Sequence, residues 1–514
     1  MSGFTSLGKK GLGGAGGGGN SLNANATGPF GTALVSGMTP TGQATFVYGI
    51  NNTQWVSGTT GNAADVLHSE AIMTCSSGQS PSGSASVRLA RSNKYRAGQG
   101  GLARFTAIFG PGQSDTMQLA GVGNGESGFY FAMSGSNFGI LHRENSKREI
   151  RSFTITSAPA GAATITVTLE GVARTVSING GGSTSQTAYQ ISNADYNQLG
   201  GGWSAEAVGS VIYFTSNRPG PRTGTFSVFN GGGSIATGAT VQVGVLPTET
   251  FVPQGSWNVD PMNGSGPSRF TIDVTKGNVY GVGYQYLGFG NPTFAIEDPE
   301  TGLLTNCHMI RRANASTSVV VRNPSMTVKW EAVNSGSLAS SVSIKGASAS
   351  IFTEGVIARN VGVGFSKSAV KSSISSTEVP VLTIRVNSVF NGQCNYGEVS
   401  PFNITFSNDS GASSGGKMLR VFVYKNASLG GPVNFTAVDS RSMVAFDTAA
   451  TSFTSEPKTQ LLKSAIVAAN SSLSISLADD NFFLSTGESL TVTAQRVTSD
   501  IDNAAVSLSW FEDQ

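Results

Sequence analysis

The sequence predicts an all-β protein made of multiple antiparallel β-sandwich domains of jelly-roll-like type, preceded by a flexible Gly-rich N-terminal arm. Short segments rich in β-branched and aromatic residues recur along the chain, each bounded by Gly, Asn, Ser or Pro. Charged residues make up 12% of the chain and 67 of its 514 residues are glycine, so Ser, Thr, Asn and Gly must cover much of the surface. Helical patterns are confined to two short segments, 185–199 and 459–470.

These segments group into an arm and three domains. Residues 1–30 form the Gly-rich arm. We expect a β-sandwich domain over residues 31–245, a second β domain over 246–335 and a C-terminal β-sandwich domain over 336–514. The clearest single element is a hairpin over residues 164–178, where Thr alternates with apolar residues before a Glu-Gly turn and Val172, Arg174, Val176 and Ile178 form the returning strand.

The composition argues against several classes of function. A formal net charge of +2 gives no basic face for nucleic acid, so we expect no nucleic-acid partner. No segment approaches the run of about 18 apolar residues that a membrane helix needs, so we expect no membrane insertion. The N-terminal residues lack the apolar run of a secretory signal, which favours synthesis in a cytoplasm.

Catalytic signatures are weak throughout the chain. His68, His142 and His308 stand outside zinc-binding motifs, and no G-x-S-x-G nucleophile elbow occurs. Acidic clusters at residues 297–300 and 479–480 are typical of solvated turns, with calcium as the alternative for the first. We therefore expect a protein that is not an enzyme, with no catalytic residues, no metal and no cofactor.

A loop at the start of the stretch KYRAGQGGLARFTAIFG, Lys94–Gly110, combines glycines with cationic side chains between strand-like flanks. Such glycines permit a tight bend or the close approach of another backbone. No helix follows, so the loop does not match a phosphate-binding motif. Arginine suits contacts with carbonyls or carboxylates, within the chain or across an interface, because its planar fork satisfies several acceptors. We predict an interface or structural loop formed by Lys94, Arg96, Gly98, Gly100, Gly101 and Arg104.

Aromatic side chains in the C-terminal region offer a second kind of candidate site. Phe482, Phe483 and Trp510 are the residues that could bind a glycan there. Most tryptophans of the chain are expected in the core, so this glycan-binding surface is the alternative and not the main interpretation.

Three strings of the sequence resemble a recurring module of virion proteins. They are NKYRAGQGGLARFTAIFG, GFYFAMSGSNFGILHRENSKREIRSFTIT and QGSWNVDPMNGSG…GYQYLGFGNPTFAIEDPETG…HMIRRAN. The module is similar to capsid-surface and fibre-like proteins of large double-stranded DNA viruses and some phages. The resemblance covers about Ser84 to Trp330 and implies no catalytic residues.

The resemblance implies a structural component of a virus particle, such as a minor capsid, penton, decoration or fibre subunit, located in the virion. The expected partners are copies of the chain itself, most readily as a trimer, and other capsid proteins. The alternative is a receptor- or glycan-binding virion protein that attaches to host surface glycans. A polysaccharide-cleaving enzyme is a weaker third interpretation, because no convincing pair of acids is found.

Overall fold

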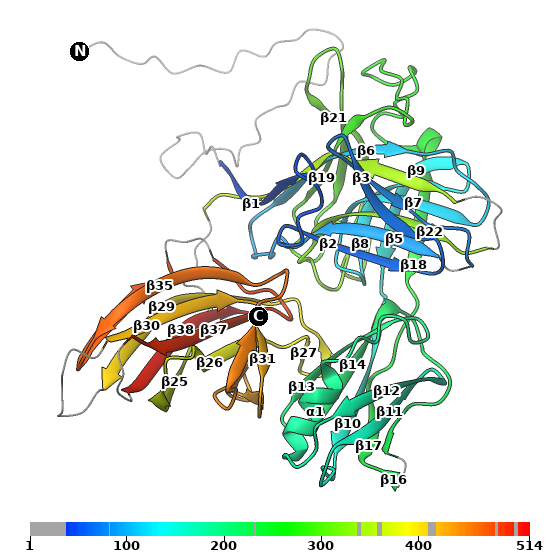
Figure 1. Ribbon diagram of the computed structural model, residues 1–514. Helices are drawn as coiled ribbons and strands as arrows, with labels where there is room; N and C mark the ends of the chain where they lie inside the picture. The colour runs from blue at the N-terminus through cyan, green and yellow to red at the C-terminus, as the bar shows by residue number, and fades with distance from the viewer. Residues whose placement is uncertain are drawn as a thin grey trace, which may run out of the picture.

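The computed structural model describes residues 37–81, 83–230, 233–336, 341–356, 362–409, 418–478, 482–497 and 502–514. Within them regular structure is almost entirely antiparallel β-sheet, which confirms the predicted all-β fold (Figure 1). The predicted Gly-rich arm, residues 1–30, lies outside the described residues. Among the described residues no helix is long and apolar enough to cross a membrane.

One of the two predicted helices is present in part, since the segment predicted over residues 185–199 is helical only as far as Ser192. The helix α1 (Thr184–Ser192) begins after Ser183, whose side chain accepts a hydrogen bond from the Gln186 amide, while the Gln186 side chain accepts one from the Ser183 amide. This reciprocal capping satisfies amide groups that the first helical turn leaves unpaired. The second prediction, a helix over residues 459–470, is wrong. That segment forms strand β35 (Gln460–Ala468), because pairing along β30 (Met418–Lys425) outweighs its helical pattern.

The described strands form three bodies that divide the chain differently from the expected boundaries. The N-terminal sandwich combines residues 37–144 with residues 248–355, and residues 145–247 form an inserted domain between these two parts. Residues 362–514 form the C-terminal sandwich. The expected boundary at residue 245 separates strands of the N-terminal sandwich that belong to one core. Sequence order alone cannot show that the chain returns to complete an earlier sheet.

The N-terminal sandwich consists of two facing antiparallel sheets. The order of the nine-stranded sheet is β21 (Leu304–Met309), β20 (Thr293–Glu297), β19 (Asn278–Tyr284), β6 (Gly101–Phe109), β23 (Ser343–Gly346), β4 (Ile72–Ser76) and β3 (Asp65–Ser69), with β24 (Ser348–Glu354) beside β6 and β1 (Met38–Thr45) beside β24. The order of the seven-stranded sheet is β18 (Thr248–Pro253), β9 (Asn137–Glu144), β8 (Gly128–Ser134), β7 (Thr116–Gly123), β22 (Thr327–Asn334), β5 (Ser84–Leu89) and β2 (Trp55–Thr60). The short 3-10 helix η2 (Gln254–Ser256) follows β18.

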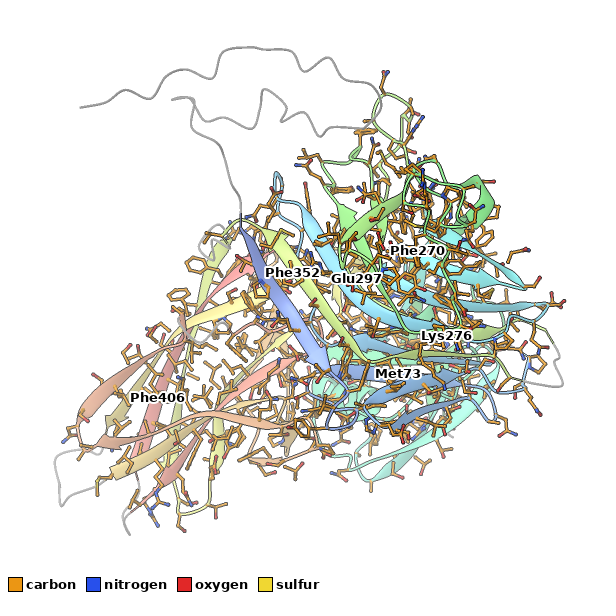
Figure 2. The ribbon with its side chains drawn as sticks, turned by 90° about the horizontal axis from the view of Figure 1, so that it is seen from above. Met73, Phe270, Lys276, Glu297, Phe352 and Phe406 are labelled. Atoms are coloured by element: carbon orange, nitrogen blue, oxygen red, sulfur yellow. The ribbon has the colours of Figure 1, made fainter. Side chains whose placement is uncertain are left out.

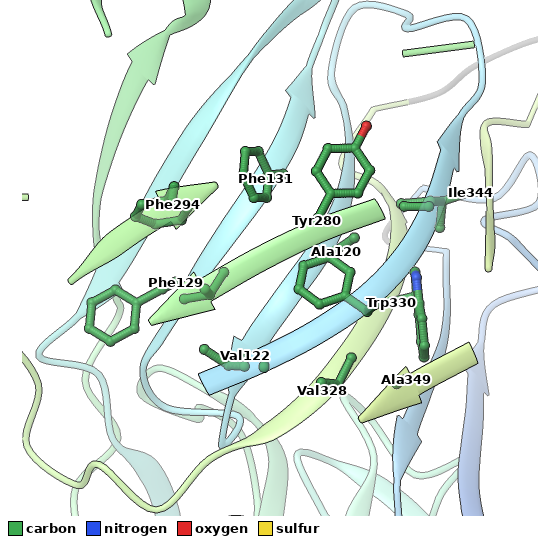
Figure 3. Close-up of a cluster of buried hydrophobic side chains, with 14 of the residues drawn as sticks. Ala120, Val122, Phe129, Phe131, Tyr280, Phe294, Val328, Trp330, Ile344 and Ala349 are labelled. Carbon is green, nitrogen blue, oxygen red and sulfur yellow. The ribbon is translucent and has the colours of Figure 1, made fainter. Parts of the chain in front are cut away.

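Aromatic side chains fill the space between these two sheets (Figure 3). Phe46 stacks on Trp55 with ring centroids 4.2 Å apart, and Trp55 lies 5.7 Å from Trp330. The Trp330 indole nitrogen donates a hydrogen bond to the Thr106 carbonyl, 2.9 Å away on the facing sheet. A Cβ added at Gly346 would lie 2.6 Å from the Trp330 ring, so the ring occupies the space that only glycine leaves open.

The inserted domain packs its own two sheets and α1 around a separate core. One sheet has the order β13 (Trp203–Val208), β14 (Val211–Pro219), β10 (Arg148–Ile155) and β17 (Ala236–Gln242). The other has the order β12 (Val172–Ile178), β11 (Ala163–Leu169), β15 (Ser227–Asn230) and β16 (Gly233–Ser234). Strands β11 and β12 are the hairpin predicted over residues 164–178.

The C-terminal sandwich also has two main sheets. The first has the order β25 (Val363–Ile374), β38 (Asp502–Asp513), β29 (Glu398–Asp409) and β36 (Ser471–Ser476). The second has the order β32 (Thr436–Ala437), β33 (Val444–Asp447), β26 (Val379–Val386), β37 (Ser489–Arg496), β30 and β35. Two short pairs complete it, β27 (Val389–Phe390) with β28 (Gln393–Cys394) and β31 (Ser428–Gly430) with β34 (Ser452–Thr454). In Figure 2, Phe406 lies in this sandwich and Met73 in the N-terminal one, and both side chains are buried in their cores.

Buried polar contacts join the inserted domain to the C-terminal sandwich. The Glu206 carboxylate accepts hydrogen bonds from the amides of Ser388 and Val389, at distances of 2.8–3.0 Å. Arg385 donates to the Ala207 carbonyl at 2.6 Å, and its guanidinium carbon lies 4.0 Å from the centroid of the Phe435 ring. These hydrogen bonds hold the two domains together. Each one satisfies a polar group that loses its contact with water at the joint between the domains.

We predict that Gly346→Ala destabilises the protein. The new Cβ would meet the Trp330 ring, which cannot move because Phe46 and Trp55 pack around it and Thr106 holds its nitrogen. The free energy of unfolding should fall by about 1–3 kcal/mol in denaturant titrations. Gly277→Ala is the matched control, since nothing lies within 4 Å of its added Cβ. Equal stability of the two variants would contradict this account of the core.

Candidate functional site

A cavity of about 340 Å³ opens at one edge of the N-terminal sandwich. It lies between β9 and β18, at the end of the seven-stranded sheet, and β21 with the segment that follows it, at the end of the nine-stranded sheet. We call it the edge cavity. Its lining residues are Ile140, His142, Thr250, Val252, Asn258, His308, Met309, Ile310, Arg311 and Arg312.

Strand alternation directs the side chains of β9 toward this cavity. Phe138 and Ile140 belong to the core, and His142 and Glu144 continue the same face of the strand as buried polar residues. Strand β18 pairs with β9 so that Thr250 lies opposite His142. The apolar face of the sandwich therefore becomes polar where the sheet ends.

The hydrogen bonds of His142 fix its tautomer. Its Nε2 lies 2.8 Å from the Val320 carbonyl oxygen, which can only accept, so Nε2 carries the proton and Nδ1 keeps its lone pair. The ring stacks on Phe129 with centroids 5.2 Å apart. Burial lowers the pKa of His142, against the opposing effect of Glu144, so the ring is neutral near pH 7.

His308 has the same tautomer as His142, but the other ring nitrogen is bound to the backbone. Its Nδ1 accepts a hydrogen bond from the Asn258 backbone amide at 3.3 Å, so the neutral ring carries its proton on Nε2. The Asn258 side chain holds the neighbouring residue of β21, donating to the Met309 carbonyl at 2.8 Å and accepting from the Met309 amide at 2.9 Å. Burial lowers the pKa of His308, and the charge of Arg311 lowers it further.

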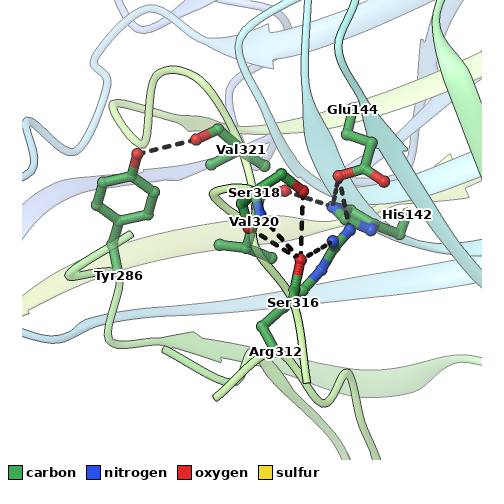
Figure 4. A network of polar contacts seen from close by, with 8 residues as sticks. All are labelled: His142, Glu144, Tyr286, Arg312, Ser316, Ser318, Val320 and Val321. Atoms are coloured by element: carbon green, nitrogen blue, oxygen red, sulfur yellow. Dashed lines mark hydrogen bonds and ion pairs between the residues drawn. The ribbon is translucent and has the colours of Figure 1, made fainter. Parts of the chain in front are cut away.

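An ion pair closes one side of the edge cavity (Figure 4). Nη2 of Arg312 lies 2.6 Å from Oε2 of Glu144, and Nη1 of Arg312 donates to the Ser316 hydroxyl at 3.2 Å. The Tyr286 hydroxyl donates to the Val321 carbonyl at 2.9 Å, which holds the segment that accepts from His142. The Arg312 guanidinium is therefore already paired with groups of the protein.

Four lining groups remain available for a ligand. The exposed Arg311 guanidinium makes no ion pair with any described residue, and the Thr250 hydroxyl has no hydrogen-bond partner in the described parts of the chain. The other two are the N–H group at Nε2 of His308 and the lone pair at Nδ1 of His142. Ile140, Val252, Met309 and Ile310 give the cavity apolar walls between these polar groups. Among the described residues no three His, Cys, Asp or Glu side chains gather as a metal site.

The loop predicted as an interface lies at the joint between the N-terminal and C-terminal sandwiches. Arg96 forms an ion pair with Asp513 of β38 at 3.0 Å. The side chain of Lys94 is buried, and both residues line a small cavity of about 20 Å³ together with Glu398 and Phe483. Lys94 and Arg96 therefore lie at the interface between two domains of the same chain.

The other residues of the predicted loop have separate roles. Gly98 has a positive φ of 88° in open space, and the Gly100 amide donates to a Glu354 carboxylate oxygen at 3.3 Å. Gly101 begins β6, where a Cβ would lie 2.8 Å from the Tyr284 ring. Arg104 is exposed on β6, away from the joint. The loop is thus structural at Gly100 and Gly101, and Arg104 does not join Lys94 and Arg96.

The predicted glycan-binding aromatics do not form an exposed surface, which corrects that expectation. Trp510 is fully buried in the core of the C-terminal sandwich, and its indole nitrogen donates to Glu512. Phe483 is buried at the joint, with the Arg91 guanidinium carbon 4.8 Å from its ring centroid. Phe482 is half-buried against the same C-terminal core. Strand alternation places Trp510 inward, as expected of most tryptophans.

Sequence reasoning noted His142 and His308 but found no site for them. They lie 166 positions apart, and only the meeting of the two sheet edges brings them to one cavity. One signal was present: in NFGILHRE the apolar positions Phe138 and Ile140 continue with His142 and Glu144 on the same face. A polar pair that extends a core face indicates a lined opening at the end of a sandwich.

No protein family and no curated protein sequence matches this chain. Solved structures with a similar arrangement include Bacillus licheniformis β-glucanase, with 9% identity, a TM-score of 0.23 and coverage of 63% of this chain and 99% of that one. The exoplasmic/lumenal domain of VIP36 in its Ca²⁺/Man3GlcNAc-bound form has 11% identity, a TM-score of 0.23 and coverage of 63% and 92%. A legume lectin-like domain from Entamoeba histolytica has 9% identity, a TM-score of 0.21 and coverage of 59% and 91%. At these TM-scores the likenesses carry no argument about function.

We predict that the joint around Glu398 weakens as the pH rises. Burial raises the pKa of Glu398 to about 7, although Arg91, Arg96 and Lys94 act in the opposite direction. Because the pKa in the folded state exceeds the ordinary value of 4.5, this group stabilises the fold below about pH 4.5, and that contribution is lost as the pH rises to about 7.

The variant Glu398→Gln keeps the neutral form at every pH. Relative to the natural chain, it should be about as stable at pH 5 and more stable by on the order of 1–3 kcal/mol at pH 8. Denaturant unfolding of both proteins at the two pH values measures this difference. A variant that is less stable at pH 8 would show instead that the surrounding cations hold Glu398 ionised.

Proposed function

We propose that this protein is an attachment protein that binds a carbohydrate in the edge cavity of its N-terminal sandwich. The observation that carries the proposal is a pair of neutral histidines that share the Nε2–H tautomer but bind the backbone through different ring nitrogens. Val320 and Asn258 fix them through backbone groups, so His142 keeps an acceptor nitrogen and His308 a donor. A sugar hydroxyl both donates and accepts, and it can use both kinds of group.

The remaining lining supports the same ligand class. The cavity volume of about 340 Å³ falls at the lower end of the range of about 300–1,000 Å³ for small-molecule pockets. The aliphatic walls suit the C–H faces of a sugar ring, and the Thr250 hydroxyl adds an adaptable polar contact. Because the polar groups are positioned by sheet edges, little conformational entropy is lost when a ligand binds.

Replacement of Thr250 by Val tests this site without disturbing the fold. Thr250 is exposed on an edge strand, and Val keeps its shape while removing the hydroxyl. Binding of a glycan identified on an array should weaken roughly 3- to 10-fold, the effect of one hydrogen bond. Thr248→Val is the matched control, because Thr248 lies on the same face of β18, is exposed and does not line the cavity.

Two results would refute the proposal. One is an array on which the full chain binds no glycan. The other is glycan binding that both threonine variants leave unchanged, since the ligand would then lie elsewhere on the protein. Calorimetric titration of the three proteins with the same glycan distinguishes these outcomes.

A second candidate function is assembly, as a subunit of a virus particle. The sequence resemblance described above supports the virion location, and exposed apolar side chains on edge strands of the C-terminal sandwich support self-association. Val370 on β25 is 74% exposed and Ile466 on β35 is 61% exposed. Edge strands with apolar side chains readily pair with other chains unless a partner covers them.

We predict that the full chain forms a symmetric oligomer, with a trimer as the first expectation. Sedimentation velocity at rising protein concentration measures the species directly. Ile466→Lys should weaken the association by placing a charge on the edge strand, whereas Asn52→Lys, in an exposed turn of the N-terminal sandwich, is the control for added charge alone. A monomer at all concentrations would refute the assembly proposal and leave the carbohydrate site untouched.

A further inference from the structure

The charges around the edge cavity do not balance. Arg312 is paired with Glu144 at 2.6 Å, so these two residues cancel. Both lining histidines are neutral near pH 7, because burial lowers the pKa of each. Arg311 is left as a cation with no opposite charge among the described lining residues. A ligand that fills this cavity therefore meets a net positive charge at one end.

Arg311 and His308 together offer hydrogen-bond donors to one group of a ligand. Both residues line the cavity, and the Arg311 charge acts on the His308 ring strongly enough to lower its pKa. The proton of His308 is on Nε2, because Nδ1 accepts from the Asn258 amide. The Arg311 guanidinium and the His308 N–H group can therefore both donate to a ligand in the cavity. A carboxylate, with two oxygens that each accept, fits such a pair of donors.

His142 presents a different group to the ligand. His142 keeps a lone pair on Nδ1, because its Nε2 proton is bound to the Val320 carbonyl. A lone pair repels an anionic oxygen and attracts a hydroxyl proton. A phosphate dianion, which presents acceptor oxygens only, would satisfy Arg311 and leave the His142 acceptor unpaired. A ligand with a carboxylate at one end and hydroxyls at the other satisfies both.

We propose that the edge cavity binds an acidic sugar, whose carboxylate contacts Arg311 and Nε2 of His308 and whose hydroxyls contact His142 and Thr250. This inference rests on the proposed carbohydrate site and names the class of sugar that the site selects. The aliphatic walls formed by Ile140 and Val252 suit the C–H faces of the sugar ring.

The test is calorimetric titration of the full chain with matched acidic and neutral sugars. The probes are glucuronate with glucose, galacturonate with galactose, and N-acetylneuraminate with its methyl ester. At least one acidic sugar should bind roughly 10-fold or more tightly than its neutral partner, because a charge-assisted contact is lost in the partner. Glucose 6-phosphate and inorganic phosphate measure the response to an anion of other chemistry.

Arg311→Gln isolates the charge at the cavity. Arg311 is exposed, so the variant should fold normally, and it should lose roughly 10-fold in affinity for the acidic sugar and little for the neutral one. Arg420→Gln is the matched control, because Arg420 is an exposed arginine on β30 of the C-terminal sandwich, far from the cavity in the fold.

The results of these experiments test the acidic-sugar inference and the proposed carbohydrate site separately. Equal binding of acidic and neutral sugars, or an unchanged affinity in Arg311→Gln, overturns the acidic-sugar inference while the carbohydrate site stands. Binding of inorganic phosphate as tight as that of the acidic sugar also overturns it, since the sugar hydroxyls would then contribute nothing. Absence of binding by every sugar removes the carbohydrate site itself.

Discussion

The antiparallel pairing of β9 with β18 is the contact on which the arrangement of this protein depends. Strand β9 is the last strand before the inserted domain and β18 is the first one after it. Their pairing brings the two ends of the inserted domain together at the edge of the sandwich. At the base of the insertion, the Lys147 amide donates to the Val245 carbonyl and the Val245 amide donates to the Lys147 carbonyl. The inserted domain can therefore fold around its own core without displacing any strand of the sandwich.

The same pairing creates the edge cavity. Because β18 ends the seven-stranded sheet, its side chains and those of β9 meet β21 at the margin of the facing sheet, where the core is no longer covered. A sandwich edge of this kind offers backbone groups as well as side chains. Val320 and Asn258 use such groups to fix the two histidine rings. The polar lining is thus rigid even though it lies at a margin of the fold.

The small number of charged residues also has a structural meaning. Several of them are buried and hydrogen-bonded: Glu206 lies between the inserted domain and the C-terminal sandwich, and Glu512 accepts from Trp510 inside the C-terminal sandwich. Arg96 and Asp513 join the two sandwiches in the same manner. Buried charges tolerate little change in geometry, because removal of one partner leaves the other without compensation. This explains why a chain with few charges places Lys94 and Arg96 in one short loop.

Local patterns were enough to predict the all-β class, the 164–178 hairpin and a helix near residue 185, because strand alternation, turn residues and capping are properties of short segments. The sequence also indicated that Arg96 and Arg104 would contact acceptors, which the structure shows for Arg96 with Asp513, whereas Arg104 is exposed on β6. Only the tertiary structure decided that residues 459–470 form an edge strand, that Trp510 and Phe483 are buried, and that residues 37–144 and 248–355 share one sandwich. It alone brought His142 and His308 together. Each of these outcomes depends on which distant strands pair, and that pairing is set by the packing of whole sheets, which no short segment encodes.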